Sequence, residues 1–249
     1  MRLSVSILFL ATAGLSAQAS PATTPAPPNI TLLKQQNASA LVQNDLITQL
    51  QAAQAAKDWP KAEGLAEKLI ALDPEDWQYR QALADVRFHK GDYAGALEAY
   101  GVALAGAGKA KVTPTLREAM ALMYSNEGNA FIKLKRNDEA IQAYTQAAQL
   151  SAHPATAWFN LCAVQYNLGM TDGALAACDK AIAADPTKAD AYFIKGSLLM
   201  GNSSIDAAGK TVAPPGTVEA LKRYLELSPK GPHAADVQQM LDYLQGKTP

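Results

Sequence analysis

Apolar residues recur along most of the chain at the three- and four-residue spacing of amphipathic helices. The stretch from Ala155 to Pro186 shows this pattern in two successive stripes, the first made of Trp158, Leu161, Cys162 and Gln165, and the second of Ala174, Cys178 and Ala181. Gly169 to Asp172 breaks the periodicity between them, which indicates a turn. Asp185 precedes a proline and therefore ends the second stripe, because that position disfavours the α conformation. The pattern predicts two helices that pack against each other as a hairpin.

The same hairpin pattern repeats at an interval of 34 residues. Tyr124, Trp158 and Tyr192 are separated by this interval, and so are Gly128, Cys162 and Gly196. Two insertions interrupt the period, one of ten residues near 105–114 and one of twelve within 202–216. A single unit of this size cannot bury its apolar stripe, so neighbouring units must stack. We therefore expect an all-α fold, an α-solenoid of about five hairpins over residues 38–227.

The two ends of the repeat array have patterns of their own. Residues 228–249 contain an apolar stripe of Val237, Met240, Leu241 and Leu244, which predicts a C-terminal capping helix. Within the second insertion, two short polar-apolar segments flank Ala207-Ala208-Gly209. These segments fit a small inserted β-hairpin and an irregular loop equally well.

The repeat resembles the tetratricopeptide repeat (TPR). The fourth unit matches through Ala157-Trp158-Phe159-Asn160-Leu161, Gly169, Ala174, Ala181 and Asp185-Pro186, and the resemblance covers about residues 43–227. The third unit departs from the family at its turn, where Lys135-Arg136 replaces the usual Gly-Asp, so we expect a different turn there. The resemblance implies a module without catalytic activity that binds an extended peptide or a helix of a partner protein.

The N-terminal residues have the composition of an export signal. Arg2 precedes an apolar run from Leu3 to Leu15, and Ala17-Gln18-Ala19 forms a small-residue cleavage pattern. We interpret residues 1–19 as a signal peptide, with an uncleaved anchor as the alternative, and residues 20–37 as a Pro-rich tether and N-terminal segment. The expected protein is an exported bacterial TPR protein, periplasmic or secreted, without membrane insertion after the signal is cleaved.

The net charge and the positions of the reactive side chains argue against several classes of function. The formal net charge is −1 and no basic block occurs, which argues against nucleic acid as a partner. His89, His153 and His233 lie in different units, so we expect neither a metal site nor any other cofactor. No nucleophile motif surrounds any serine, and we predict no catalytic residues.

The two cysteines of the chain occupy matching places in the fourth hairpin. Cys162 lies seven residues before Gly169 and Cys178 lies six residues after Asp172, so both stand at a similar height above the turn. In sister units the same two places hold a small residue and a ring, as in Gly128 with Tyr144 and Gly196 with Tyr224. We predict a disulfide in this oxidising compartment; a pair of packed free thiols is the alternative.

The first helices of a stacked solenoid line its concave surface, the usual binding face. The residues that the helical period places there define the candidate partner-binding groove: Asn126, Asn129, Lys133, Phe159, Asn160, Tyr166 and Phe193. Asn126 and Asn160 are in register, and a carboxamide both donates to and accepts from a peptide backbone. The alternative is that the phenylalanines only pack between units. Lys133 is the clear cation of this set, which argues against recognition of a C-terminal carboxylate.

Two rival functions remain beside a protein-binding scaffold. One is a structural subunit of a cell-envelope assembly, and the other is an accessory enzyme whose catalytic residues form no linear motif. A peptide or protein that co-purifies supports the scaffold, a stable envelope complex supports the structural subunit, and catalytic turnover supports the accessory enzyme.

Overall fold

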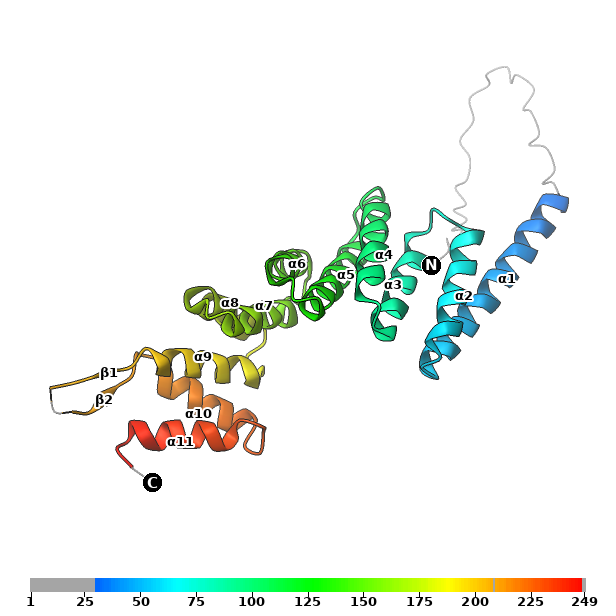
Figure 1. Ribbon diagram of the computed structural model, residues 1–249. Coiled ribbons are helices and arrows are strands. Elements are labelled where there is room, and N and C mark those ends of the chain that lie inside the picture. Colours follow the sequence, from blue (N-terminus) through cyan, green and yellow to red (C-terminus); the bar gives the residue numbers. More distant parts are fainter. Residues whose placement is uncertain (1–29, 208, 248–249) are drawn as a thin grey trace, which may run out of the picture. The chain divides into compact units, whose positions relative to one another are not determined.

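The computed structural model describes residues 30–207 and 209–247, so the predicted signal peptide lies outside the described residues. Eleven helices and one two-stranded sheet occur in this part of the chain (Figure 1). The helices are α1 (Ile30–Ala55), α2 (Trp59–Leu72), α3 (Trp77–Lys90), α4 (Tyr93–Ala107), α5 (Pro114–Lys133), α6 (Asn137–Leu150), α7 (Ala155–Asn167), α8 (Thr171–Ala184), α9 (Ala189–Gly201), α10 (Thr217–Leu227) and α11 (Ala234–Leu244). None of these helices is long and apolar enough to cross a membrane.

The helices pair as hairpins in chain order. The pairs α3–α4, α5–α6, α7–α8 and α9–α10 are in contact, and each second helix also contacts the first helix of the next hairpin. The end of α1 joins the same arrangement, because Leu50 and Ala53 are buried in one core with Ala62 and Leu65 of α2. The predicted α-solenoid of five hairpins is therefore confirmed.

Helix α1 begins earlier in the chain than the sequence pattern predicted. It begins at Ile30, inside the segment 20–37 that the sequence assigned to a tether, eight residues before the expected start of the solenoid. The division between the two compact units of the chain falls after Leu41, within this helix, so its last residues belong to the unit that contains the repeats.

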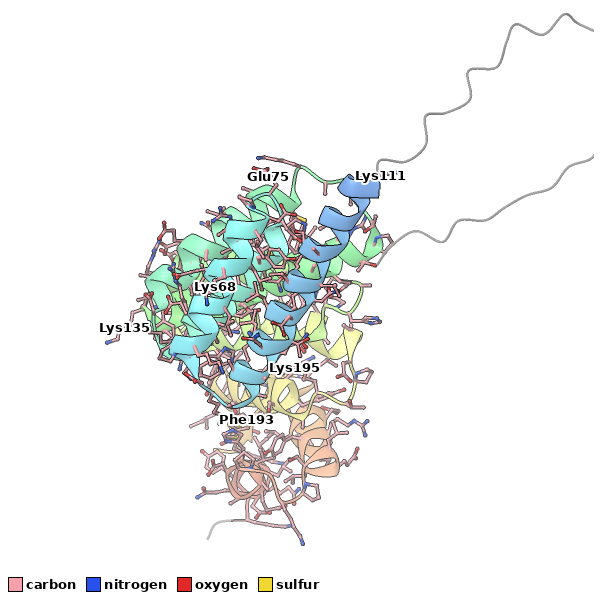
Figure 2. All side chains as sticks on the ribbon, turned by 90° about the vertical axis from the view of Figure 1, so that its right-hand side faces the viewer. Lys68, Glu75, Lys111, Lys135, Phe193 and Lys195 are labelled. Carbon is pink, nitrogen blue, oxygen red and sulfur yellow. A yellow bond between two sulfur atoms is a disulfide. The ribbon has the colours of Figure 1, made fainter. Side chains whose placement is uncertain are left out.

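The turns of the first four hairpins share one backbone geometry. Gly91 and Gly169 have positive φ angles of 91° and 71°, and Lys57 and Lys135 adopt the same region at 57° and 59°. At each turn this residue donates to the carbonyl three positions back and the next residue donates five positions back, as in a Schellman motif. The expectation of a different turn at Lys135-Arg136 is therefore wrong. The turn is kept because its hydrogen bonds are made by the backbone, and the exposed Lys135 side chain extends into solvent (Figure 2).

The two insertions are built differently. The first divides between a loop after Ala107 and a lengthened α5, whose Pro114 follows the N-cap Thr113. The second contains an antiparallel hairpin of β1 (Ser204–Ile205) and β2 (Thr211–Val212), so the β-hairpin alternative is the one found. Ile205 on this hairpin is 73% exposed, and Figure 1 shows the hairpin extending beyond the end of α9.

Helix α11 closes the C-terminal end of the array, as predicted for residues 228–249. Its Val237 and Leu241 are buried together with Leu221 and Tyr224 of α10. Burial of these four side chains supplies the apolar contact that a further repeat would otherwise provide.

Small residues set the spacing within the hairpins. Gly128 of α5 faces the ring of Tyr144 in α6, as the repeat pattern predicted. Gly196 of α9 instead faces Leu221 of α10, so its expected pairing with Tyr224 is wrong. The twelve-residue insertion lies between α9 and α10, and it removes the fixed sequence offset from which that pairing was inferred.

Candidate functional site

Some first helices of neighbouring hairpins lie against one another: α3 contacts α5, and α7 contacts α9. The corresponding sides of the first helices α3, α5, α7 and α9 are together called the first-helix surface here. It is the surface to which the sequence assigned Asn126, Asn129, Lys133, Phe159, Asn160, Tyr166 and Phe193.

On α5, two of these residues hold other polar groups of the protein. Asn126 donates from Nδ2 to the Oδ1 atom of Asp85 on α3, at 3.1 Å. Asn129 accepts through Oδ1 from the Tyr144 hydroxyl, at 2.7 Å. Their side chains are partly buried, and their first role is to link helices. Lys133, at the end of α5, is exposed and makes no ion pair within the described residues.

Asp85 is a member of this surface that the sequence analysis missed. Its carboxylate also accepts from the Tyr100 hydroxyl of α4. Burial raises the pKa of Asp85, and the hydrogen bonds from Tyr100 and Asn126 act in the opposite direction. The available signal was a polar residue fifteen positions before a buried tyrosine, which Asp85–Tyr100 shares with Asn129–Tyr144. Burial likewise raises the pKa of Tyr144 to about 12, so this hydroxyl stays a donor at neutral pH.

On α7, the three predicted residues are all partly buried. Phe159 and Tyr166 pack against the core that also contains Leu161 and Val164. Asn160 lies between them in sequence, and its side chain has no hydrogen-bond partner within the described part of the chain. The carboxamide of Asn160 is thus available to a ligand, in contrast to those of Asn126 and Asn129.

The Phe159 ring has a cation nearby. The Nζ atom of Lys188, just before α9, lies 5.9 Å from the ring centroid and donates to Thr156 Oγ1 at 3.2 Å. Lys188 and Thr156 are both at least partly accessible to solvent, and Thr156 lies on the same helix as Phe159. An aromatic ring and an ammonium group therefore lie close together where α7 meets the start of α9.

Phe193 on α9 is covered by the C-terminal part of the chain. Its ring stacks on His233, with 3.8 Å between ring centroids and 2° between ring planes. His233 in turn donates its backbone N–H to the Tyr224 hydroxyl at 3.0 Å. Phe193, labelled in Figure 2, therefore packs between units, which is the alternative raised for the phenylalanines.

The cysteine pair lies at the centre of the hairpin that carries Phe159, Asn160 and Tyr166. The Cα atoms of Cys162 and Cys178 are 5.1 Å apart, within the range that a disulfide requires. Both side chains are fully buried, and the two sulfur atoms are at bonding distance. A cross-link at this place joins α7 to α8 directly beneath the candidate groove residues.

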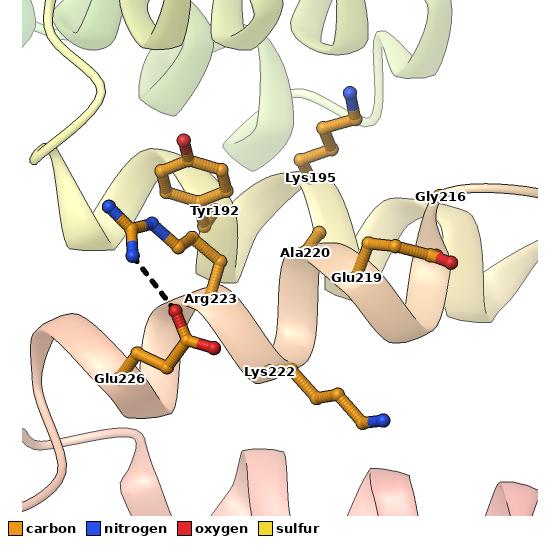
Figure 3. Close-up of a pocket in the computed structure, with 8 residues that line it drawn as sticks. All are labelled: Tyr192, Lys195, Gly216, Glu219, Ala220, Lys222, Arg223 and Glu226. Carbon is orange, nitrogen blue, oxygen red and sulfur yellow. Dashed lines mark hydrogen bonds and ion pairs between the residues drawn. The ribbon is translucent and has the colours of Figure 1, made fainter.

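A second type of surface lies between α9 and α10 (Figure 3). The groove there measures about 460 Å³ and is lined by Tyr192, Lys195, Glu219, Lys222, Arg223 and Glu226, among others. Arg223 pairs with Glu226 at 2.8 Å, and Lys195 pairs with Asp179 of α8 at 2.6 Å. Several of the charged residues of this groove are therefore already engaged in ion pairs.

The described part of the chain contains no candidate metal site. No group of three or more His, Cys, Asp or Glu side chains is arranged there to hold an ion. His89 stacks on Trp59 at 5.1 Å and bonds the Asp85 carbonyl, while His233 stacks on Phe193. Both rings have structural partners.

Comparisons with known proteins agree with this geometry. Residues 47–110 match a family profile described as tetratricopeptide repeat, and residues 128–169 match one described as TPR repeat. No significant match is found among curated proteins.

Solved structures share the arrangement of helices. A crystal structure of YrrB, described as a TPR protein with an unusual peptide-binding site, is 18% identical, with a TM-score of 0.59 over 85% of this chain and 98% of that one. A crystal structure of MamA is 22% identical, with a TM-score of 0.58 over 72% and 94% of the two chains. A tetratricopeptide repeat protein from Parabacteroides merdae is 16% identical, with a TM-score of 0.60 over 82% and 74%.

The stacked hairpins, their common turn and the small residues between paired helices define an α-solenoid built from 34-residue repeats. Both profile matches fall on these hairpins, so residues 47–110 and 128–169 are tetratricopeptide repeats.

Proposed function

We propose that this protein is a non-enzymatic scaffold that binds an extended peptide or a helix of a partner protein on its first-helix surface. The observation that carries the proposal is the carboxamide of Asn160, unpartnered within the described residues, on the same helix as the partly buried rings of Phe159 and Tyr166. A carboxamide satisfies both groups of a peptide unit, and the rings bury the side chains next to it.

The neighbouring residues support this choice of surface. Asn126 and Asn129 are fixed by their bonds to Asp85 and Tyr144, so the first-helix surface is preorganised where a ligand would cross from α7 to α5. Lys133 adds an exposed cation at the end of α5. The peptide-binding site ascribed to the similar protein YrrB is consistent with a ligand of this type.

We further propose that the protein acts in the periplasm or outside the cell, where the signal-like residues 1–19 would direct it. A pair of buried cysteines at disulfide distance suits an oxidising compartment. Fractionation of cells that express the full chain tests this: protein found uncleaved in the cytoplasm contradicts it.

A site-specific cross-linker tests the binding surface. A photo-reactive amino acid in place of Thr156 or Lys133 should capture the same partner protein. Thr156 is exposed one helical turn before Asn160, so the Asn160 carboxamide is kept. The matched control is Lys222, which is exposed on α10 in the groove of Figure 3. Capture at Lys222 but at neither Thr156 nor Lys133 excludes the first-helix surface as the binding site.

A substitution then separates binding from folding. Asn160→Ala should weaken partner capture while the midpoint of thermal unfolding stays nearly constant, because this side chain has no hydrogen-bond partner among the described residues. Asn126→Ala is a poorer probe, since it also removes a hydrogen bond to the partly buried carboxylate of Asp85. Unchanged capture by Asn160→Ala contradicts the proposed role of its carboxamide.

A further inference from the structure

Helix α5 carries a second row of residues on the side opposite to Asn126 and Asn129. Tyr124, Glu127 and Phe131 are three and four positions apart, so they lie on one side of the helix on successive turns. They line a groove of about 480 Å³ together with residues of α6, among them Ala143 and Gln146. This row is here called the outer row of α5.

Glu127 is the unusual member of the outer row. In the next hairpin, 34 residues on, the same place is held by Leu161, which is buried in the core. The Glu127 carboxyl is partly buried and makes no hydrogen bond or ion pair within the described residues. Burial raises its pKa to about 7. A carboxyl in this position costs free energy unless a partner compensates for its lost hydration.

In the two following hairpins, a cation lies beside the ring that corresponds to Tyr124. Trp158, which corresponds to Tyr124, has the Nζ atom of Lys180 at 4.2 Å from its ring centroid. Tyr192, the next equivalent, has Arg223 beside it (Figure 3), and the pKa of Arg223 is raised by Glu226 and then by Tyr192. In both hairpins a cation from the second helix accompanies the ring.

Helix α6 supplies no such cation to Tyr124 or Glu127. Gln146 lies 34 residues before Lys180, and Ala143 precedes Tyr144 as Arg223 precedes Tyr224. Both residues line the groove and both are neutral. The nearby Arg136 lies over Phe131, 4.7 Å from the ring centroid, and pairs with Glu139 at 2.9 Å. Tyr124 and Glu127 are therefore left with a ring face and a carboxyl group that no cation of the described chain occupies.

We propose that Tyr124 and Glu127 bind the side chain of a lysine or arginine from a partner protein. The carboxylate pairs with the ammonium or guanidinium group, the Tyr124 ring attracts its positive charge, and the apolar groove takes its aliphatic stem. The external side chain occupies the place that Lys180 and Arg223 fill in the neighbouring hairpins. This contact lies across α5 from the first-helix surface, and it is independent of the function proposed for that surface.

Titration of the full-length, isotope-labelled protein with short peptides tests the proposal by NMR. The probe is acetyl-Gly-Arg-Gly-amide, and the matched control is the peptide with Gln in place of Arg. The Arg peptide should shift the backbone amide signals around Tyr124, Glu127 and Gln146, and the Gln peptide should not. Glu127→Gln should weaken the binding of the Arg peptide about fivefold, since it removes the ion pair but keeps the shape of the side chain.

A second variant makes the assignment specific to the groove. Gln146→Lys places an ammonium group where Lys180 stands in the next hairpin, so it should also weaken the binding of the Arg peptide, although Glu127 is retained. The substitution Lys222→Gln, in the separate groove between α9 and α10, serves as the control and should leave the binding unchanged.

Three results overturn the proposal. Equal binding of the Arg and Gln peptides removes the role of charge. If Glu127→Gln and Gln146→Lys both bind the Arg peptide as tightly as the wild type, the peptide does not bind in this groove. The same conclusion follows if the signal shifts are confined to Asn160 and its surroundings. Glu127-dependent binding of tetramethylammonium without binding of the Arg peptide identifies a small organic cation, not a protein side chain, as the ligand.

Discussion

A Cβ atom placed on Gly128 lies 2.6 Å from the Cε1 atom of Tyr144, closer than two carbon atoms approach without a bond. Helices α5 and α6 therefore pack with the tyrosine ring directly against a glycine backbone. Gly128→Ala should destabilise the protein by about 1–3 kcal/mol, because the buried ring has to move, and this outweighs the higher helix propensity of alanine. Denaturant unfolding measures the change.

The control for this substitution is Gly101, which lies on the exposed side of α4. A Cβ atom placed on Gly101 meets no other atom of the described chain within 4 Å. Gly101→Ala should stabilise the protein by up to about 1 kcal/mol, since only the helix propensity changes there. Equal effects of the two substitutions contradict the close approach of α5 and α6.

The cysteine pair yields a prediction about covalent structure. If Cys162 and Cys178 are joined, iodoacetamide should modify neither of them in the unfolded, unreduced protein, and should modify both after reduction. The bond closes a loop with a sequence separation of 16 residues, so reduction should lower the free energy of unfolding by about 3 kcal/mol. Two modified cysteines without reduction establish the alternative, a pair of packed free thiols.

Lys135 occupies a turn position that suits glycine. Its φ angle of 59° costs about 1–2 kcal/mol for a residue with a side chain. Glycine removes this strain, but it also makes the unfolded chain more flexible, which offsets part of the stabilisation. Lys135→Gly should therefore stabilise the protein by about 0.5–1 kcal/mol in thermal unfolding, and Lys57→Gly should do the same. Lys133→Gly, inside the last turn of α5, should act in the opposite direction.

The pKa of Glu127 predicts how stability depends on pH. In the folded protein burial raises this pKa from 4.5 to about 7, so between these values the folded state binds more protons than the unfolded state. The free energy of unfolding should therefore fall as pH rises from 4.5 to 7, by on the order of 2 kcal/mol from this group. Glu127→Gln should remove that part of the fall.

Other groups near Glu127 titrate as well. Burial also raises the pKa of Asp85, which adds a decrease of the same sign, and the pKa of Tyr100 lies well above this range. The difference between the wild-type and Glu127→Gln stability curves isolates Glu127. Parallel curves between pH 4.5 and 7 contradict the raised pKa.

The sequence by itself determined the fold class and the pairing of elements. Residues such as Tyr124, Trp158 and Tyr192 recur at a fixed interval because each hairpin buries the same positions against its neighbours. That local rule was enough to predict the hairpins, the capping helix and the approach of Cys162 to Cys178. It failed at Gly196, where the insertion before α10 shifts the register.

The polar contacts and the availability of each candidate side chain were decided only by the tertiary structure. Asn126 and Asn160 occupy equivalent positions, yet Asn126 is bonded to Asp85 because α3 presents an acid at that place, while Asn160 has no such partner among the described residues. Phe193 matches Phe159 in sequence, but His233 covers it, since the chain folds back at its C-terminal end. Periodicity fixes the side of a helix on which a residue lies; the neighbours that satisfy or cover its side chain come from other helices, and the repeat does not encode them.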